Sequence, residues 1–423
     1  MATNKSKNSN PKKSQGSSKK QTTPNYQKKA IKTVKKAAKK NPKAFIIIVI
    51  VLLLVIGAGA AVYFFFLKDR LNNGGTSSEE VVSSEVVPVD YNPTLSNSKG
   101  VSINFLQLGN WFTGDSTFIK INDLDVLIDA GSRQESSTTI AKFITDNHFC
   151  TDGKLEYVIA THAHRDHIAG FVGTADNPGI FDTYKIGTII DFALTNQTME
   201  DDLYNKYVTK MEAGLASGNI EHHYTALQCV EETGGAQKEY VLADGITMTI
   251  LDQKFYKETS SKENNYSVCT LFTQNNNHYL FTGDLEKAGE VSLVAKNTLP
   301  HCQLFKGGHH GSKTSNNDEL LSVIQPETVC ICSCCGSPEF KANDLNTFPT
   351  QETINNIAKY TNRIYVTSLY NASLEEKYEA LNGDICFKCE DGSTYTITGS
   401  NNSTILKETD WFKANRTWPE DGK

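Results

Sequence analysis

The sequence predicts one α/β domain with layered sheets from about residue 101 onward, preceded by a single transmembrane helix at residues 44–67. Three observations support this prediction. Residues 44–67 contain no charged side chain. After residue 100, short apolar strand-like segments alternate with helix-like segments, without a split into a strand-rich and a helix-rich half. The 423 residues are enough for one large domain with appendages.

The chain begins with a lysine-rich arm, residues 1–43, which holds 14 lysines and no Asp, Glu or Arg. Its low-complexity Lys, Ser, Asn and Gln composition is typical of a disordered segment. We expect the arm to lie on the cytoplasmic side, near anionic lipid headgroups. The whole chain carries a net charge of −6, so the remainder carries −20. This acidic balance disfavours tight binding of the large domain to nucleic acid.

The apolar segment 44–67 is long enough to cross a membrane. As a helix it would rise about 36 Å, which exceeds the ~30 Å hydrocarbon core of a bilayer. Tyr63–Phe66 form an aromatic belt at one end, followed by Lys68 and Arg70. A cleaved signal peptide is the main alternative, but the apolar run exceeds the usual length of the apolar h-region of such a peptide. We therefore expect a single-pass protein of the cell membrane, with its large domain extracellular beyond a flexible Ser, Asn, Gly and Glu-rich linker at residues 68–100.

The domain is expected to span residues 101–410, with a C-terminal tail at 411–423. The predicted strands are Val101–Leu108, Thr117–Ile121, Asp125–Asp129, Leu155–Thr161, Lys185–Ile190, Thr247–Leu251, Val268–Thr273, Tyr279–Thr282, Gln303–Lys306, Val329–Cys334, Arg363–Thr367, Asp384–Phe387 and Tyr395–Thr398. The predicted helices are Ser137–Asn147, Met199–Ala216, Glu286–Lys296, Asp318–Ile324 and Gln351–Tyr360.

The ten cysteines do not form the pattern of a metal knuckle. Cys330, Cys332 and Cys334 alternate along a predicted strand, so they share one face and are expected to pack as small hydrophobic side chains. Cys386 and Cys389 form a C-x-x-C without a second pair at zinc-finger spacing. We therefore expect buried thiols or one local disulfide.

The segment His162–His167, of sequence HAHRDH, carries the strongest chemical signal. It holds four potential metal ligands in six residues, directly after the apolar strand Leu155–Ala160. Imidazoles and carboxylates are the ligands that zinc takes in catalytic sites. In an extended loop His162 and His164 point the same way, whereas Asp166 and His167 open the next helix. The segment therefore predicts two metal positions.

Two later segments place further ligand-type residues at strand ends. Thr282-Gly283-Asp284 follows an apolar strand, and its carboxylate could bridge two metals. The second segment ends in His309-His310-Gly311-Ser312 after the strand Gln303–Lys306. Together with His162–His167, these segments predict one site at the carboxyl ends of several strands.

The H-x-H-x-D-H run, the T-G-D and the H-H-G-S resemble the metallo-β-lactamase superfamily, and most of all its ComEC-type competence proteins, from about Ile103 to Thr398. The resemblance implies an αββα sandwich and two divalent metals, Zn²⁺ or alternatively Mn²⁺. It implies that Asp129, in Leu127–Gly131, orients the metal loop from behind. The implied metal ligands are His162, His164, Asp166, His167, Asp284 and His310.

The sequence departs from the competence branch at two places. Gln107 stands where those proteins usually have Asp, and Trp111–Thr113 look inserted. A third histidine for the first metal is not evident, and His222 and His223 lie at the wrong point of the chain. The first metal is then held by His162, His164 and the bridging Asp284, with water or substrate completing its coordination.

The paired histidines and Asp284-Leu285-Glu286 also resemble choline-phosphate esterases. This resemblance implies that His310 binds metal, while His309 and Glu286 contact the substrate phosphate or leaving group, although the roles within the histidine pair could be reversed. Asp166 and Asp284 are the expected catalytic carboxylates. Lys313 is a candidate phosphate contact and also a candidate solvated side chain.

The apolar segment and the lysine-rich arm predict a membrane-anchored protein with its large domain outside the cytoplasm, and the resemblance implies that this domain is a metal-dependent hydrolase. Its substrate is expected to be a phosphodiester or another phosphoester, associated with the cell envelope, which is attacked by water that the metals activate. A nuclease acting on extracellular DNA is one alternative, which the acidic domain disfavours. A non-catalytic surface binding module is another.

Overall fold

The computed structural model describes residues 91–340 and 346–423. The lysine-rich arm, the predicted transmembrane helix at 44–67 and residues 68–90 of the predicted linker lie outside these ranges. In the described part of the chain, no helix combines the length and the apolar character that a membrane span requires.

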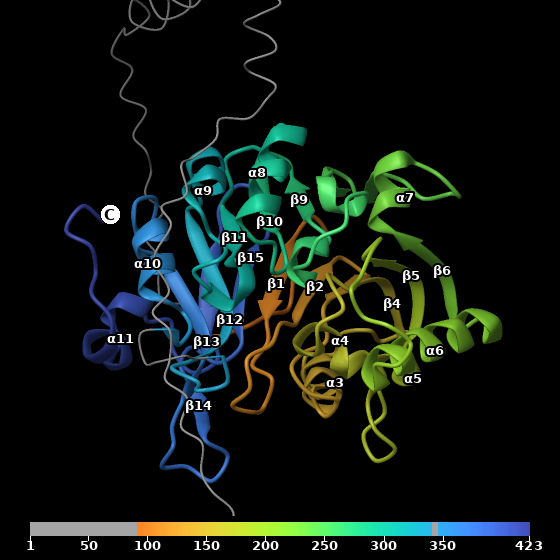
Figure 1. Ribbon diagram of the computed structural model, residues 1–423, viewed down its shortest axis with the longest axis horizontal. Helices are drawn as coiled ribbons and strands as arrows, with labels where there is room; N and C mark the ends of the chain where they lie inside the picture. The colour runs from red at the N-terminus through yellow and green to blue at the C-terminus, as the bar shows by residue number, and fades with distance from the viewer. Residues whose placement is uncertain (1–90, 341–345) are drawn as a thin grey trace, which may run out of the picture. The chain divides into compact units, whose positions relative to one another are not determined.

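Two eight-stranded sheets form the centre of the domain (Figure 1). The first has the order β16-β15-β1-β2-β3-β4-β5-β6, with parallel pairing from β3 to β6 and antiparallel pairing elsewhere. Its strands are β1 (Val101–Phe105), β2 (Thr117–Ile121), β3 (Leu124–Ile128), β4 (Lys154–Ile159), β5 (Lys185–Asp191), β6 (Ile220–Thr225), β15 (Ile385–Cys389) and β16 (Thr396–Gly399).

The second sheet has the order β14-β13-β12-β11-β10-β9-β8-β7, with parallel pairing from β10 to β13. Its strands are β7 (Glu239–Ala243), β8 (Ile246–Ile250), β9 (Thr270–Gln274), β10 (Asn277–Phe281), β11 (Leu304–Lys306), β12 (Thr328–Cys335), β13 (Ile364–Tyr370) and β14 (Tyr378–Ala380). Parallel strands that are covered on both faces are expected to be buried along their whole length. Every residue of β11 and β12 is buried.

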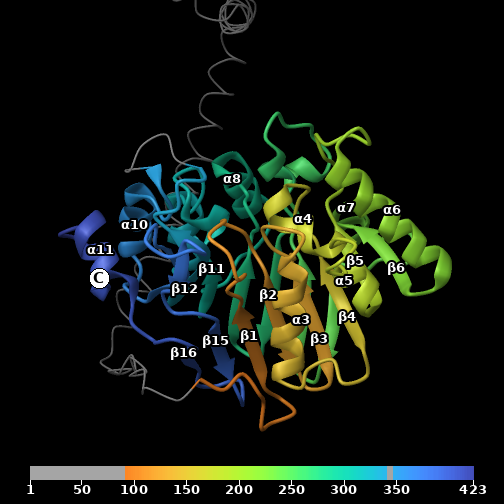
Figure 2. The ribbon, with the colours of Figure 1, turned by 90° about the horizontal axis from the view of Figure 1, so that it is seen from below.

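Helices lie beside both sheets (Figures 1 and 2). Helices beside the first sheet are α3 (Ser136–Asp146), α4 (Arg165–Val172), α5 (Ile180–Thr183), α6 (Asp202–Ser217) and α7 (Ala226–Glu231). Helices beside the second sheet are α8 (Lys287–Lys296), α9 (Asp318–Ile324) and α10 (Gln351–Ala358), with α11 (Asp410–Asn415) near the C-terminus. Short 3₁₀ helices occur at Lys254–Tyr256, Glu263–Tyr266, Gly308–Gly311 and Leu406–Glu408.

The helices pack through apolar stripes at helical spacing. In α3 the buried apolar residues are Ile140, Phe143 and Ile144, and in α10 the buried stripe includes Ile354 and Ile357. One core cluster joins the first sheet, its helices and the inner face of the second sheet. The other joins the outer face of the second sheet to α8, α9 and α10. The layers therefore follow the order helix, sheet, sheet, helix, as the predicted αββα sandwich requires.

Every predicted strand and helix has a counterpart in the structure, and the helix expected to open at Asp166 and His167 is α4, but three strands and three α-helices of the described residues were not predicted, nor were the short 3₁₀ helices. The three strands are β6, β7 and β14, and the three α-helices are α5, α7 and α11. The strands β6 and β7 lie at sheet edges and are partly exposed, so they lack the apolar runs of central strands.

The predicted domain boundaries fall inside packed structure. In the predicted linker, the backbone N–H groups of Ser96 and Asn97 donate to the Glu390 carboxylate, each at 3.1 Å. In the predicted tail, α11 buries Phe412, and the Arg416 guanidinium donates to the carbonyls of Thr347 and Pro349. The compact fold therefore includes residues on both sides of 101–410.

All ten cysteines are buried, and none forms a disulfide. Cys330 and Cys332 lie on the face of β12 that packs into the core between the sheets, as their alternation predicts. Burial raises the pKa of the Cys332 thiol to about 12. These thiols are therefore protonated packing groups near neutral pH.

Candidate metal centre

The predicted ligands come together at the carboxyl ends of β4, β10 and β11, beside Asp129 at the end of β3. The loop after β4 carries His162, His164, Asp166 and His167, whereas Asp284 follows β10 and His310 follows β11. Because these strands are parallel to their neighbours within each sheet, their carboxyl ends lie at the same edge of the sandwich. The two sheets therefore contribute to one site.

Asp129, at the end of β3, holds the first ligand loop in place. Its carboxylate accepts hydrogen bonds from the Thr161 N–H at 2.8 Å, the Thr161 hydroxyl at 2.8 Å and His167 Nδ1 at 2.7 Å. Since Nδ1 of His167 donates to Asp129, Nε2 is the ring nitrogen that faces the centre. The backbone of Asp129 has a φ of +57°, which turns the chain sharply at this point.

A glycine allows the helix after the ligands to approach this turn. Gly170 of α4 donates its N–H to the Ala130 carbonyl at 3.0 Å, and a Cβ at position 170 would collide with that carbonyl oxygen. The Ala130 N–H in turn donates to the His167 carbonyl at 2.7 Å. These backbone contacts fix the start of α4, and therefore Asp166 and His167, against the end of β3.

His162 and His164 present two nitrogen atoms to each other. His162 Nε2 lies 3.0 Å from His164 Nδ1. The Thr161 hydroxyl donates to Asp129, so it accepts from His162 Nδ1 at 3.2 Å and leaves Nε2 without a proton. Burial and the neighbouring histidine charges hold the pKa of His162 well below its ordinary value. Both atoms are thus suited to share one cation.

Asp166, His167 and His310 surround the Asp284 carboxylate. Oδ2 of Asp284 lies 3.2 Å from His167 Nε2 and 3.3 Å from His310 Nε2, which itself lies 3.3 Å from Asp166 Oδ2. Three buried atoms here make no hydrogen bond of acceptable geometry: His167 Nε2, His310 Nε2 and Asp284 Oδ1. Buried polar atoms are rarely left unpaired, and two imidazole nitrogens facing one carboxylate oxygen suit a divalent cation. The residues present therefore fit divalent metal.

The charges of this cluster point to the same conclusion. Burial lowers the pKa of His167, but the carboxylates of Asp284 and Asp129 outweigh it and raise the pKa well above its ordinary value. Burial alone would raise the pKa of Asp166. The hydrogen bond to His310 and the charge of His167 outweigh burial, so the pKa of Asp166 lies below its ordinary value. Strong pKa shifts of opposite sign in one buried cluster mark a site where positive charge is needed.

The structure distinguishes the two histidines of the pair. His310 is fully buried, donates through Nδ1 to the Cys332 carbonyl at 3.0 Å and turns Nε2 to the centre. His309 lies beside the centre. Its Nδ1 is 2.8 Å from the Thr314 hydroxyl, and its Nε2 is 3.7 Å from Asp284 Oδ2. Both residues have left-handed backbone, with φ of +49° and +52°, which gives their side chains different directions.

Two buried residues of the site were not predicted from the sequence. Asp115 lies with its Oδ1 3.1 Å from His310 Nδ1, and Lys306 forms an ion pair with it. Lys306 Nζ also lies 3.8 Å from Asp284 Oδ1. Asp115, His167, Asp284 and His310 each have a ligand-type atom within 4.8 Å of the others. The only sequence signal for Asp115 is that it is a lone charged residue between Gly114 and the strand β2, and such a segment resembles an ordinary turn.

Glu286 and Lys313 lie to one side of this cluster. Glu286 precedes α8 and accepts a hydrogen bond at 3.3 Å from the Asn264 side chain, whose Nδ2 also lies 3.4 Å from His309 Nδ1. Lys313 is exposed and lines a separate cavity of about 750 Å³ together with Glu286. Glu286 is therefore connected to His309 through Asn264, whereas Lys313 is not among the residues that line the pocket at the centre. His223 pairs with Asp191 at 2.8 Å and contacts none of the predicted ligands.

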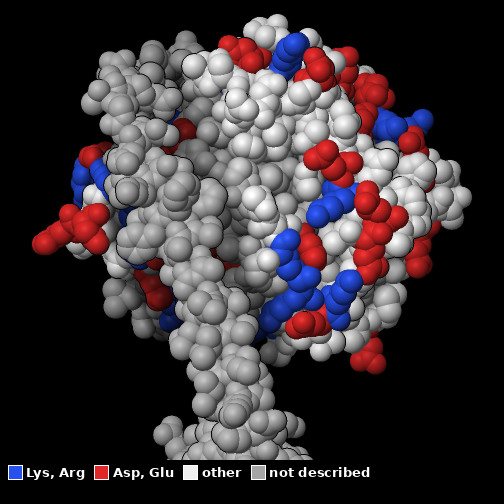
Figure 3. All heavy atoms as spheres, turned by 90° about the horizontal axis from the view of Figure 1, so that it is seen from above, with Lys and Arg blue, Asp and Glu red and all other residues white. Residues whose placement is uncertain are grey.

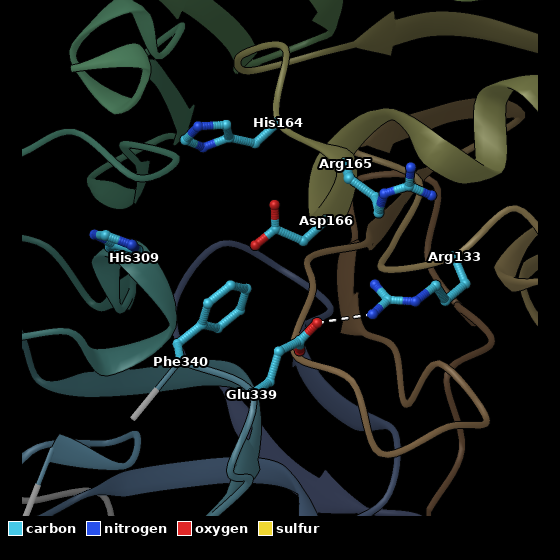
Figure 4. A pocket seen from close by; sticks show the side chains of 7 residues that line it. All are labelled: Arg133, His164, Arg165, Asp166, His309, Glu339 and Phe340. Carbon is cyan, nitrogen blue, oxygen red and sulfur yellow. Dashed lines mark hydrogen bonds and ion pairs between the residues drawn. The ribbon is translucent and has the colours of Figure 1, made fainter. Parts of the chain in front are cut away.

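An open pocket of about 390 Å³ leads to the centre (Figure 4). His164, Asp166 and His309 form the part of its wall nearest the metal ligands. The other residues that line it are Arg133, Arg165, Glu339 and Phe340. A substrate in this pocket would therefore contact both candidate metal ligands and residues outside the predicted ligand set.

Comparisons with known proteins agree with the predicted resemblance. Residues 109–180 match the family model of the metallo-beta-lactamase superfamily, a segment that includes Asp115, Asp129 and the ligands His162–His167. ComE operon protein 3 of Bacillus subtilis is 27% identical over 160 residues, which are 36% of this chain and 19% of that protein. Recombination protein 2 of Haemophilus influenzae is 37% identical over 71 residues, which are 17% of this chain and 9% of that protein. The matches thus span less than a fifth of either relative.

Solved structures with a similar chain path include two with high coverage. The metallo-beta-lactamase fold protein YhfI from Bacillus subtilis has a TM-score of 0.37 and 11% identity, over 63% of this chain and 95% of that one. The short form of human tRNase Z has a TM-score of 0.31 and 13% identity, over 63% of this chain and 92% of that one. The predicted resemblance to the metallo-β-lactamase superfamily and its ComEC-type members is confirmed by the family match and the sequence relatives.

Proposed function

We propose that this chain, a metallo-β-lactamase-type hydrolase, cleaves phosphodiesters or other phosphoesters with two divalent metal ions. One observation carries the proposal: buried imidazole nitrogens and the Asp284 carboxylate converge without satisfactory hydrogen bonds, beside an open pocket whose wall includes the candidate ligands His164 and Asp166. A structural ligand set would be closed to solvent, whereas a catalytic one keeps access for a substrate.

In this proposal the ligand atoms form two groups that share Asp284. His162 and His164 would hold one metal, and Asp166, His167 and His310 would hold the other. When bound, the two cations would polarise a phosphoryl oxygen and make a water molecule more acidic. We favour Zn²⁺ because imidazole and carboxylate suit it, with Mn²⁺ as the alternative.

The chain's own residues then orient the substrate. Burial lowers the pKa of His309 to about 4, so this imidazole is neutral near pH 7 and can donate or accept one hydrogen bond. Its position beside Asp284, with Nδ1 held by Thr314, suits contact with a phosphoryl or leaving-group oxygen. Glu286 acts on His309 through Asn264 in this proposal.

The proposal includes the membrane location. Residues 44–67 would anchor the chain, with the lysine-rich arm on the cytoplasmic side and the hydrolase domain extracellular. Its support is the uncharged apolar run and the 14 lysines that precede it. An envelope-associated phosphoester is the substrate that such a location would favour.

A nuclease acting on extracellular DNA is the second candidate, because the two sequence relatives are a ComE operon protein and a recombination protein. Against it, the chain after residue 43 carries a net charge of −20. On the face drawn in Figure 3, outside the grey atoms, acidic and basic side chains are intermixed rather than segregated. A long polyanion would meet repulsion over much of such a surface.

The test is hydrolysis of bis(4-nitrophenyl) phosphate by the full chain loaded with Zn²⁺ or Mn²⁺. We expect turnover that Asp166→Ala abolishes and that Asp202→Ala, a change at a residue whose side chain is 83% exposed, leaves intact. Choline-phosphate esters and DNA would follow as substrates, with DNA binding titrated against salt. Two bound metals without turnover of any phosphoester would reject the proposal and favour a binding module.

A further inference from the structure

The pocket over the metal centre has a cationic wall that binds no metal. Arg133 and Arg165 both line it, and in Figure 4 they lie on the opposite side from His164 and His309. The substrate position over Asp166 is thus flanked by His164 and His309 on one side and by two guanidinium groups on the other. The proposed reaction at the metals assigns no role to this wall.

Arg165 is a cation without a partner. It is exposed, and no described residue forms a hydrogen bond or ion pair with its guanidinium. Its backbone lies between the ligands His164 and Asp166, as the first residue of α4. The ligand loop therefore fixes the distance of the Arg165 backbone from the metal centre, while the Arg165 side chain remains free to bind an anion.

Arg133 is held rigidly next to it. Its Nη2 donates to Glu339 Oε1 at 2.8 Å, Nη1 donates to the Ser132 carbonyl, and the guanidinium carbon lies 3.4 Å from the centroid of the Phe112 ring. Glu339 is itself fixed, since its other oxygen accepts the Thr113 N–H at 2.8 Å. The loop Trp111–Thr113, which looked inserted in the sequence, thus supports Arg133 from two sides.

Together these three side chains leave one uncompensated positive charge on the wall, because Glu339 balances only one arginine. A substrate with a single phosphoester would place its charge at the metals and leave this cation unused. A cationic group, such as choline, would be repelled at this wall. Guanidinium groups bind phosphate and carboxylate through several N–H donors at once.

We propose that Arg165, supported by Arg133, binds a second phosphate of the substrate next to the scissile phosphoester. This inference rests on the proposed phosphoesterase function and narrows its substrate to compounds with at least two neighbouring phosphates. The second phosphate has two possible sources: a terminal phosphate monoester, or the next phosphodiester along a polymer.

Matched thymidine substrates test the proposal with the metal-loaded full chain. The dinucleotide TpT has one phosphate, its 5′-phosphorylated form pTpT adds a terminal monoester, and the trinucleotide TpTpT adds a second diester. We expect kcat/KM to be roughly tenfold or more higher for pTpT, TpTpT or both than for TpT, because a charge-assisted contact adds about that much. The preferred compound identifies the source of the second phosphate.

Variants connect this preference to the wall. Arg165→Met is expected to reduce the ratio of two-phosphate to one-phosphate kcat/KM to near one, and Arg165→Lys to restore part of it. Arg133→Met should reduce the ratio less, because Glu339 already compensates that charge. Lys185→Met, at an exposed residue that begins β5 away from the pocket, is the charge-matched control and should not change the ratio.

Two results would overturn the inference: a wild-type ratio near one, or a ratio that Arg165→Met leaves unchanged. If the protein hydrolyses none of these compounds, binding replaces turnover as the readout. Thymidine 3′,5′-bisphosphate should then bind roughly tenfold more tightly than thymidine 5′-monophosphate, and Arg165→Met should remove the difference. If turnover is absent but this binding difference is present, the phosphoesterase proposal is rejected, whereas binding of a second phosphate by Arg165 is not. Equal binding of the two compounds rejects binding of a second phosphate by Arg165.

Discussion

Two loops bring histidines to the metal centre, and they are held in place by different means. The loop His162–His167 after β4 contributes four ligands from one short segment, and one carboxylate, Asp129, orients it through three hydrogen bonds. The loop Gly307–Asn317 after β11 contributes His310 alone to the proposed ligand set. A larger buried network supports this second loop.

The second loop is anchored by residues far from its ligand. The Glu290 carboxylate of α8 accepts the N–H groups of Asn316 at 2.7 Å and Asn317 at 3.0 Å. The Asn316 side chain in turn binds both the N–H and the carbonyl of Gly308, at 2.7 and 2.9 Å. A ligand held by such a network depends on many residues, whereas a contiguous motif depends on few.

Asp284 belongs to neither loop, and its loss should have the largest effect because both proposed metals share it. We expect Asp284→Ala to lower kcat/KM by on the order of 10⁴-fold or more. Metal content and phosphodiester turnover are the measurements. The exposed variant Asp202→Ala is the control, and substantial turnover by Asp284→Ala would contradict a bridging role.

Replacement of each of the two histidines of the second loop by alanine should have a different effect on metal content and turnover. His310→Ala is expected to lose one of the two metals and nearly all turnover, because its Nε2 faces Asp166 and Asp284. His309→Ala should keep both metals and lose roughly 10²-fold in kcat, as removal of a proton-transfer or phosphate contact does. Metal stoichiometry by elemental analysis decides the assignment. The opposite pattern would mean that His309 is the ligand.

Asp115 offers a smaller test of the same loop, since it lies behind His310 rather than beside the substrate. Asp115→Asn removes the charge that pairs with Lys306 and faces His310 Nδ1. We expect metal affinity to fall roughly 10- to 100-fold, as it does when partners behind metal ligands are replaced. Metal titration of the variant gives this value directly. Unchanged affinity would show that the Cys332 carbonyl alone orients His310.

The anchor of the second loop should affect stability rather than chemistry. Burial raises the pKa of Glu290 from 4.5 to about 7. A folded-state pKa above the unfolded value means that the stabilising contribution is complete below about pH 4.5 and is lost as pH rises to about 7. At about 1.4 kcal/mol per pKa unit, the loss is on the order of 3 kcal/mol.

Glu290→Gln removes this titration. The free energy of unfolding of the variant, measured by denaturant titration at several pH values, should fall less steeply between about pH 4.5 and 7 than that of the wild type. Equal slopes for both proteins would show that Glu290 does not carry the pH dependence. Glu221→Gln, at a partly exposed residue of β6, serves as the matched control.

The sequence by itself determined the fold class, the strands and helices that are long and apolar, and the candidate ligands that lie close together in the chain. His162, His164, Asp166 and His167 were identifiable because the loop places them within six residues after one strand. Asp284 and the pair His309-His310 were identifiable because each also follows an apolar strand. Edge strands such as β6 escaped prediction, since exposure on one side removes the apolar run that marks a buried strand.

Only the tertiary structure decided which contacts depend on distant parts of the chain. His310 rather than His309 faces Asp284 most directly because the left-handed backbone of both residues directs one ring into the core and the other into the pocket. Asp115 meets Lys306 across 191 positions of sequence, and Arg133 meets Glu339 across 206. Such pairs leave no periodic or local pattern, because folding, not sequence spacing, brings their charges together.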